Sequence, residues 1–267
     1  MKTINAHGRQ FRLGRNRPAR RKLATTMKQL RVDDVLPPIV VPDSTDYRTA
    51  ALPSLRNVYG NDRLGDCVIA GGAHVRGVTS FNAGGGSLFT DDQIILQYAA
   101  IGGYDPNDPD SDQGCDENTA LNFWRTTGWP DGVKLIRAVS VDPTSISEIN
   151  EALYLFENLF FGVSLPEEWI DPIPSGDGFD WTLAGPAIPE NGHCFIGCDI
   201  APGGAGIIID TWGMLGTISY AAIAQYASAG SSGQLFTLLT PDIVDRVTAK
   251  SPAGYDVETL TEYLNAL

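Results

Sequence analysis

The sequence predicts an α+β domain whose first half is helical and whose second half is a mainly antiparallel sheet. Apolar residues recur at helical spacing between residues 67 and 127, whereas short apolar and β-branched runs broken by glycine and proline fill residues 133–239. The chain has 267 residues and is 43% hydrophobic, which is enough to bury a substantial core. Because the helical segments precede the strands, we expect a cleft between two halves.

The helical half is expected to begin with a buried helix over residues 67–81, since this stretch is rich in Ala, Val and Ile and three glycines follow it. Thr90 is a suitable N-cap for the next helix, and Ser145 with Glu148 forms a capping-box pattern ahead of a fourth. The other helices are expected at residues 91–101, 117–127, 145–156, 242–248 and 257–267, and the strands at residues 133–141, 158–165, 193–200, 206–210 and 234–239.

Charge separates the N-terminus from the rest of the chain. Ten of the 19 Lys and Arg residues lie between Lys2 and Arg31, where no acidic residue occurs. The rest of the chain therefore has nine basic and 32 acidic residues, which gives it a formal net charge of about −23. Such an arm docks on nucleic acid, an acidic partner or its own body, or stays a disordered tail. Prolines between residues 35 and 53 then indicate an extended segment. We divide the chain into a basic arm with a Pro-rich segment, residues 1–50, and a compact domain, residues 51–267.

Composition argues against several classes of protein. No apolar run reaches the length of a membrane span, and the arginine-rich N-terminus lacks the pattern of a signal peptide, so we expect a soluble protein without membrane contacts. The four cysteines lack CxxC spacing and are expected to be reduced thiols. The acidic stretch at residues 105–112 departs from the EF-hand pattern and is expected to be a solvated turn. We therefore expect no metal and no cofactor.

Cys67 is the candidate nucleophile. It follows the turn Gly65-Asp66 at the start of a predicted helix, and a helix N-terminus with a nearby imidazole is the usual means of lowering the pKa of a thiol. A buried structural cysteine is the alternative for this position taken alone.

The chain has three histidines that could act as the base. His7 lies in the arm, and His74 is seven residues beyond Cys67, about 10 Å along the same helix, so we expect His74 to be a packed helical residue. His193 remains, at the start of a predicted strand. Asp210 ends the next apolar run and could orient the imidazole of His193, or it could simply end its strand at the surface.

The motifs around these residues resemble those of papain-like cysteine peptidases. Gly65-Asp66-Cys67-Val68-Ile69-Ala70 is similar to the family's Gly-Ser-Cys-Trp-Ala-Phe, and Asp210-Thr211-Trp212-Gly213 is similar to its Asn-Ser-Trp-Gly. Gln113-Gly114-Cys115-Asp116 resembles the family's Gly-Cys segment. The order of the motifs is also that of the family, from about Asn61 to Gly213, and 126 residues separate Cys67 from His193.

The resemblance implies a papain-like fold, with Cys67 on a helix N-terminus in the helical half and with His193 and Asp210 in the β half. It implies a Cys-His-Asp triad that cleaves peptide or amide bonds, or transfers the acyl group, and takes a peptide or protein as its substrate. The oxyanion would bind the backbone amide of Cys67 and the side chain of Asn61, which stands where the family has a longer glutamine. Asp210 stands where the family usually has asparagine.

A second function is open at this point. Chains with the pattern Asn-Asp-Arg-x-Gly-Asp-Cys and a Lys-Ser-Pro-Ala-Gly-Tyr-Asp tail, both present here, resemble an uncharacterised papain-like group in bacteria and their phages. The alternative is thus a non-catalytic structural protein of a phage or virus particle, whose arm, residues 1–31, contacts neighbouring subunits or nucleic acid. The expected location is the bacterial cytoplasm or the virion. The arm distinguishes the alternatives, because a propeptide should cover Cys67 whereas an assembly arm should leave the body.

Overall fold

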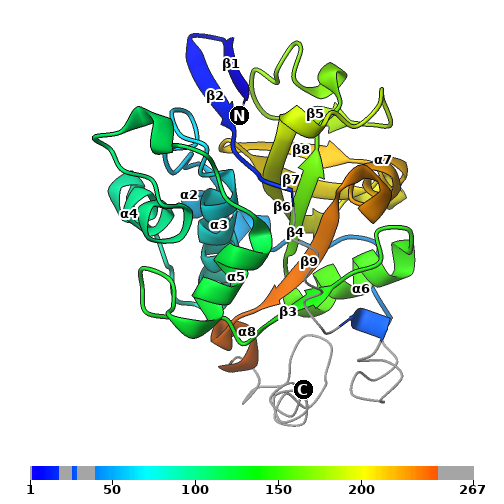
Figure 1. The fold of residues 1–267 in the computed structure, drawn as a ribbon. Coiled ribbons are helices and arrows are strands. Elements are labelled where there is room, and N and C mark those ends of the chain that lie inside the picture. The colour runs from blue at the N-terminus through cyan, green and yellow to red at the C-terminus, as the bar shows by residue number, and fades with distance from the viewer. Residues whose placement is uncertain (1, 18–25, 29–39, 246–267) are drawn as a thin grey trace.

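The protein folds into a helical half and a sheet half, as Figure 1 shows for a computed structural model that describes residues 2–17, 26–28 and 40–245. The helical half contains the helices α2 (Arg48–Leu55), α3 (Cys67–Asn82), α4 (Asp91–Gly102) and α5 (Glu117–Thr126). The second half contains a seven-stranded sheet, together with α6 (Ile146–Phe156) and α7 (Tyr220–Tyr226). The α+β architecture with helices first and sheet second is confirmed.

Helix α3 is the central element of the helical half. Every residue from Cys67 to Ser80 is buried, as the apolar composition of this stretch predicted. Glycines within the helix let neighbours approach its backbone: a Cβ on Gly72 would lie 2.5 Å from the ring of Trp129, and one on Gly77 would collide with Ser54. Cys67 is the first residue of this tightly packed helix, so its position is fixed by the core behind it.

The sheet has the strand order β3-β9-β4-β6-β7-β8-β5, and all its pairs are antiparallel except β5 with β8. Strands β4 and β6 are buried on both faces, with α3 on one side and α6 and α7 on the other. Alternate residues therefore enter two different cores: Phe160 and Cys194 pack toward α3, whereas Phe161 and Phe195 pack toward α6 and α7. The strands are β3 (Arg137–Ser140), β4 (Leu159–Ser164), β5 (Phe179–Trp181), β6 (Gly192–Ile200), β7 (Ile207–Thr211), β8 (Met214–Ile218) and β9 (Gln234–Leu239).

Helix ends follow the capping signals in the sequence closely. Thr90 and Gln93 form a reciprocal capping box at α4. Ser145 caps α6 by accepting from the backbone of Glu148. The carboxylate of Glu148, however, accepts from the backbone N–H of Asp142 rather than of Ser145, so only half of the expected capping box forms at α6.

Several elements differ from the sequence-based expectations, and strands β5 and β8 and helix α7 were not expected at all. The arm contains a β-hairpin, β1 (Lys2–Ala6) with β2 (Arg9–Leu13), where no strand was expected. The expected extended segment up to residue 53 ends early, because α2 begins at Arg48. Buried Asp199 explains this start: its carboxylate accepts from the backbone N–H of Tyr47 at 2.6 Å and binds the Arg48 guanidinium at 2.9 Å. Helix α8 (Pro241–Asp245) covers the described part of the helix expected at residues 242–248, whereas residues 246–248 and the helix expected at residues 257–267 lie outside the described residues.

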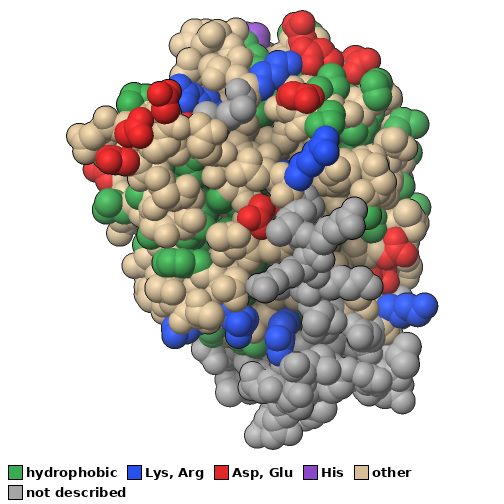
Figure 2. Space-filling view, viewed as in Figure 1, with side chains coloured by type: hydrophobic (Ala, Val, Ile, Leu, Met, Phe, Trp, Pro, Cys, Tyr) green, Lys and Arg blue, Asp and Glu red, His purple; other side chains and the backbone are tan. Residues whose placement is uncertain are grey.

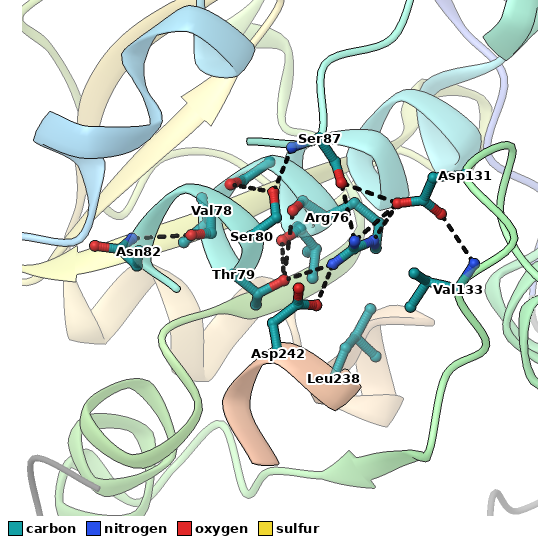
Figure 3. Close-up of polar contacts among 12 residues, drawn as sticks. Arg76, Val78, Thr79, Ser80, Asn82, Ser87, Asp131, Val133, Leu238 and Asp242 are labelled. Carbon is teal, nitrogen blue, oxygen red and sulfur yellow. Dashed lines mark hydrogen bonds and ion pairs between the residues drawn. The ribbon is translucent and has the colours of Figure 1, made fainter. Parts of the chain in front are cut away.

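One buried arginine joins α3 to two distant segments (Figure 3). Arg76 is 2% exposed, and its guanidinium donates to Asp131 at 2.8 and 2.9 Å and to the Ser87 hydroxyl at 2.9 Å. It also contacts Asp242 in α8. This network fixes the C-terminal part of α3 against the rest of the molecule and leaves the Cys67 end to face the cleft.

Candidate functional site

A small cavity at the junction of the two halves brings the predicted site residues together. Cys67 from α3, His193 from β6, Asp210 from β7 and Asn61 from the loop before α3 all line it. The cavity has a volume of about 10 Å³, close to the smallest that holds a water molecule. The sequence-predicted residues therefore share one site, and in this state the site has no room for a substrate.

The turn that presents Cys67 is held by a buried carboxylate. Asp112 accepts from the backbone N–H of Gly65 at 3.0 Å and from the hydroxyl of Tyr98 at 2.8 Å. Asp112 belongs to the acidic stretch expected to be a solvated turn, but it is only 3% exposed. Its role is to fix the backbone two residues before the thiol.

The imidazole of His193 is fixed by residues other than Asp210. Its Nε2 lies 2.8 Å from the hydroxyl of Thr211, and its ring stacks on Trp212 with centroids 4.4 Å apart. Among the described residues, Nδ1 has no hydrogen-bond partner, Cys67 included, so it is the ring nitrogen that stays free to accept a proton. Sequence reasoning missed Thr211, although this residue directly follows Asp210 in the motif Asp-Thr-Trp-Gly.

Asp210 faces a second histidine. Its Oδ2 lies 3.4 Å from Nε2 of His74, which packs against the ring of Tyr59 and also lines the cavity. Burial raises the pKa of Asp210 well above its ordinary value and lowers the pKa of His74 to about 3. The sequence spacing could have predicted the position of His74. Residues seven apart share one face of a helix, so His74 faces the same way as Cys67.

Burial also sets the protonation of the catalytic candidates. Cys67 and His193 are each 1% exposed. Burial raises the pKa of Cys67 to about 12 and lowers the pKa of His193 to about 3. In this state the pair therefore consists of a neutral thiol and a neutral imidazole, and a reactive thiolate requires the site to open.

The basic arm covers part of the site. The chain leaves the β1–β2 hairpin at the top of Figure 1 and runs down between the two halves. Phe11 packs edge-on against Trp212, with ring centroids 5.3 Å apart. The Arg12 carbonyl accepts from Nδ2 of Asn61 at 3.3 Å, and the backbone of Gly14 lies at the Cys67 thiol, where its hydrogen bond opposes the rise in the pKa of that thiol. The arm thus lies directly over the site.

The arm binds the cleft walls through its backbone, as an extended peptide does. Cys115 donates its N–H to the Gly14 carbonyl at 3.1 Å, and Arg15 donates its N–H to the Gly192 carbonyl at 3.1 Å. Close approach requires glycine on both walls: a Cβ on Gly114 would collide with the Gly14 carbonyl, and one on Gly192 with the Arg15 carbonyl.

Ion pairs between the arm and the body complete this contact. Lys2 binds Glu167 at 2.8 Å, Arg12 binds Asp112 at 2.6 Å, and Arg15 pairs with Glu117. The sequence left open whether the arm docks on nucleic acid, on an acidic partner or on its own body. These three ion pairs join the described part of the arm to acidic residues of its own body. On the face seen in Figure 2, the described Lys and Arg side chains are scattered singly among acidic and neutral ones.

The described residues contain no group of three or more His, Cys, Asp or Glu side chains that could hold a metal ion. Two carboxylates of the acidic stretch at residues 105–112 turn onto its own backbone, since Asp105 and Asp108 accept from the N–H groups two residues on, whereas Asp112 binds Gly65 and Tyr98 outside the stretch. All four cysteines are buried free thiols. No helix within the described part of the chain is long and apolar enough to cross a membrane.

Comparison with known proteins relates the fold to solved structures. No protein-family model and no curated protein matches the sequence. The crystal structure of xylellain, a cysteine protease from Xylella fastidiosa, is similar with a TM-score of 0.58 and 14% identity over 88% of this chain and 99% of that one. A structure from work on the mite allergens Blo t 1 and Der p 1 has a TM-score of 0.49 and 14% identity over 74% of this chain and 71% of that one. The likeness to xylellain establishes that the chain has the papain-like fold.

Proposed function

We propose that the protein is a papain-like cysteine peptidase in a latent state, with Cys67 as the nucleophile and His193 as the base. The observation that carries the proposal is the shared cavity, which is lined both by a thiol at the start of a helix and by an imidazole whose Nδ1 has no hydrogen-bond partner among the described residues. An accessible thiol beside an imidazole at a helix N-terminus is the arrangement that produces a reactive thiolate.

The proposed reaction uses the residues on the cavity wall. His193 takes the thiol proton of Cys67, and the sulfur attacks the carbonyl carbon of a peptide bond. The same proton passes from His193 to the leaving amine, and a water molecule then hydrolyses the thioester. Thr211 and Trp212 keep the imidazole in position, as their contacts with the ring suggest. If an amine replaces the water, the same acyl-enzyme gives acyl transfer.

The oxyanion of the tetrahedral intermediate is assigned to Asn61 and the backbone N–H of Cys67. The Asn61 amide already donates to a peptide carbonyl, that of Arg12, at 3.3 Å, and to the Leu64 carbonyl at 3.0 Å. A peptide carbonyl bound to Asn61 while the adjoining backbone lies at Cys67 supports this role for the shorter side chain.

The arm accounts for the latency. It covers Cys67, as expected of a propeptide, and its described ion pairs join it to its own body. These contacts favour an inhibitory role for the arm over the alternative of a non-catalytic particle protein whose arm reaches a neighbouring subunit or nucleic acid.

The test is to open the site and measure the reactivity of Cys67. In the full-length Arg15→Ala variant, an electrophilic thiol probe should label Cys67 faster than Cys115 or Cys198, as read by peptide mass spectrometry. Adding His193→Ala should slow the labelling of Cys67 by about a hundredfold. Hydrolysis of a generic fluorescent casein should fall in parallel. If Cys67 reacts no faster than the other thiols, or if His193→Ala changes nothing, the protein is not a cysteine peptidase of this kind.

A further inference from the structure

The side chain of Arg15 enters a buried pocket beside the proposed reaction site. The side chains of Arg15 and Glu117 are 1% and 0% exposed, and Nε of Arg15 donates to Oε1 of Glu117. Arginine is rarely buried so completely, and here it belongs to an arm that is otherwise partly exposed. The pocket therefore surrounds the guanidinium of a residue that is not part of the body's own core.

The pocket is shaped for a long side chain. Gly162 of β4 forms one wall, where a Cβ would lie 2.6 Å from Nε of Arg15 and would collide with the carboxylate of Glu117. Any other residue at position 162 would fill the space that the guanidinium uses. Glu117, in the first turn of α5, forms the floor.

The charge of the floor requires a cation. Glu117 is fully buried, and its Oε2 has no hydrogen-bond partner among the described residues. Removing a carboxylate from water is strongly unfavourable unless a partner compensates its charge. Burial raises the pKa of Glu117, and the neighbouring Arg15 opposes that rise. A neutral or acidic side chain in this pocket would leave the carboxylate uncompensated.

The pocket is placed where a substrate side chain would lie. The backbone of Arg15 and its neighbours bonds to Gly192, the residue before His193, and to Cys115 on the opposite wall. Gly14, one residue away, lies at the Cys67 thiol. A peptide held by the same backbone groups would therefore present a side chain to Glu117 within a few residues of the bond that is cleaved.

We propose that Glu117 is the floor of a subsite for an arginine or lysine side chain, which Arg15 fills in the latent protein. This inference rests on the proposed function, because it names the substrates of that peptidase: peptides with a basic residue at this subsite. Glu117 is the residue that determines specificity, and Gly162 leaves room for the basic side chain.

The activity test uses full-length Arg15→Ala and compares it with Arg15→Ala/Glu117→Gln, in which no uncompensated charge is buried. The substrates are matched fluorogenic peptides that carry Arg, Lys, norleucine or Glu at one position, scanned over four positions on each side of the bond. With Arg15→Ala, kcat/KM for Arg at one position should exceed that for norleucine by about tenfold to a hundredfold. The preference should disappear with Glu117→Gln. Equal rates for Arg and norleucine, or a preference that survives Glu117→Gln, would overturn the subsite.

A binding test separates this proposal from the peptidase activity. A fluorescent peptide of residues 9–17 is titrated into Arg15→Ala, beside the same peptide with citrulline, the neutral analogue, in place of Arg15. The citrulline peptide should bind about tenfold more weakly, and Glu117→Gln should abolish the difference. If the citrulline peptide binds more weakly as expected but Cys67 is unreactive, the peptidase proposal fails and the subsite proposal stands. If the two peptides bind equally, the subsite proposal fails. Should Arg15→Ala not fold, as judged by circular dichroism, Arg15→Gln replaces it as the same opened background.

Discussion

At the scale of single residues, the site depends on which group holds the imidazole of His193. The hydroxyl of Thr211 lies 2.8 Å from Nε2 of His193. The described contact of the Asp210 carboxylate is with the ring of His74 instead. A hydroxyl can accept a hydrogen bond from Nε2–H without bringing a charge into the cavity, so in the proposed mechanism it favours the tautomer in which Nδ1 accepts the thiol proton. Under the proposed mechanism we therefore assign the positioning role to Thr211 rather than to Asp210, whose carboxylate contacts His74.

This assignment predicts different effects for two conservative substitutions. In the Arg15→Ala background, Thr211→Val keeps the shape of the side chain and removes the hydrogen bond, so labelling of Cys67 should slow by about tenfold to a hundredfold. Asp210→Asn should slow it less. The control is the melting temperature, which identifies any loss of labelling that comes from unfolding. If Asp210→Asn slows the labelling of Cys67 more than Thr211→Val does, the carboxylate of Asp210 orients the imidazole and the assignment to Thr211 is wrong.

Asp210→Asn also has a predicted effect on stability. The pKa of Asp210 is raised in the folded protein, so the folded state binds a proton more tightly than the unfolded state does. The stability that this carboxyl contributes is therefore present below its unfolded pKa, about 4, and is lost as the pH rises. We expect Asp210→Asn to be more stable than the wild type at pH 8 and to lose this advantage near pH 4, as measured by urea unfolding at both values. An unchanged difference between the two pH values would contradict the raised pKa.

At the scale of secondary-structure elements, the fixed helix α3 is what positions the thiol. Its far end is held by Arg76, which binds carboxylates from a loop and from α8 (Figure 3). We predict that Arg76→Met lowers the free energy of unfolding by about 3 kcal/mol, because Asp131 and Asp242 lose their cation. The matched control is Arg125→Met on the exposed face of α5, which should change stability by less than about 0.5 kcal/mol. Urea titration of both variants measures the difference.

The elements most faithfully predicted from the sequence are those fixed by local signals and full burial. Helix α3 starts at the predicted residue, and the capping box of α4 forms as predicted, since both depend on residues adjacent in the sequence. Strands β6 and β9 likewise match their apolar runs. The papain-like fold expected from the motif order is confirmed, although each motif is short.

Features that depend on distant partners could not be predicted in the same way. Helix α2 begins where it does because Asp199, about 150 residues away, accepts from its first N–H groups. The hairpin of the arm and the course of the arm over Cys67 depend on carboxylates and glycines from several parts of the chain. The triad of Cys67, His193 and Asp210 stays a prediction, and the contacts of Asp210 with His74 are invisible in a motif comparison.

At the scale of the whole molecule, the basic arm and the acidic body act as two complementary parts. The ten basic residues of the N-terminal stretch carry charge opposite to that of a body near −23. The described contacts place this complementarity at the cleft, where Arg12 binds Asp112, the carboxylate that holds Gly65, and Arg15 binds Glu117. A change that weakens the arm should therefore act on the chemistry of Cys67 without touching any residue of the cavity.

The last prediction compares two ion pairs of the arm. Arg12→Ala removes the cation from Asp112, whose carboxylate is 2% exposed, whereas Lys2→Ala removes a pair whose side chains are 33% and 47% exposed. Exposed pairs contribute little to stability, so only Arg12→Ala should loosen the arm.

Because burial is what raises the pKa of Cys67 to about 12, exposure of the site should lower that pKa and increase the fraction of thiolate. We expect iodoacetamide to label Cys67 slowly between pH 6 and pH 9 in the wild type and in Lys2→Ala. In Arg12→Ala the rate should rise by about tenfold or more over this range, as read by mass spectrometry. Equal rates in all three proteins would mean that the arm does not control access to the thiol.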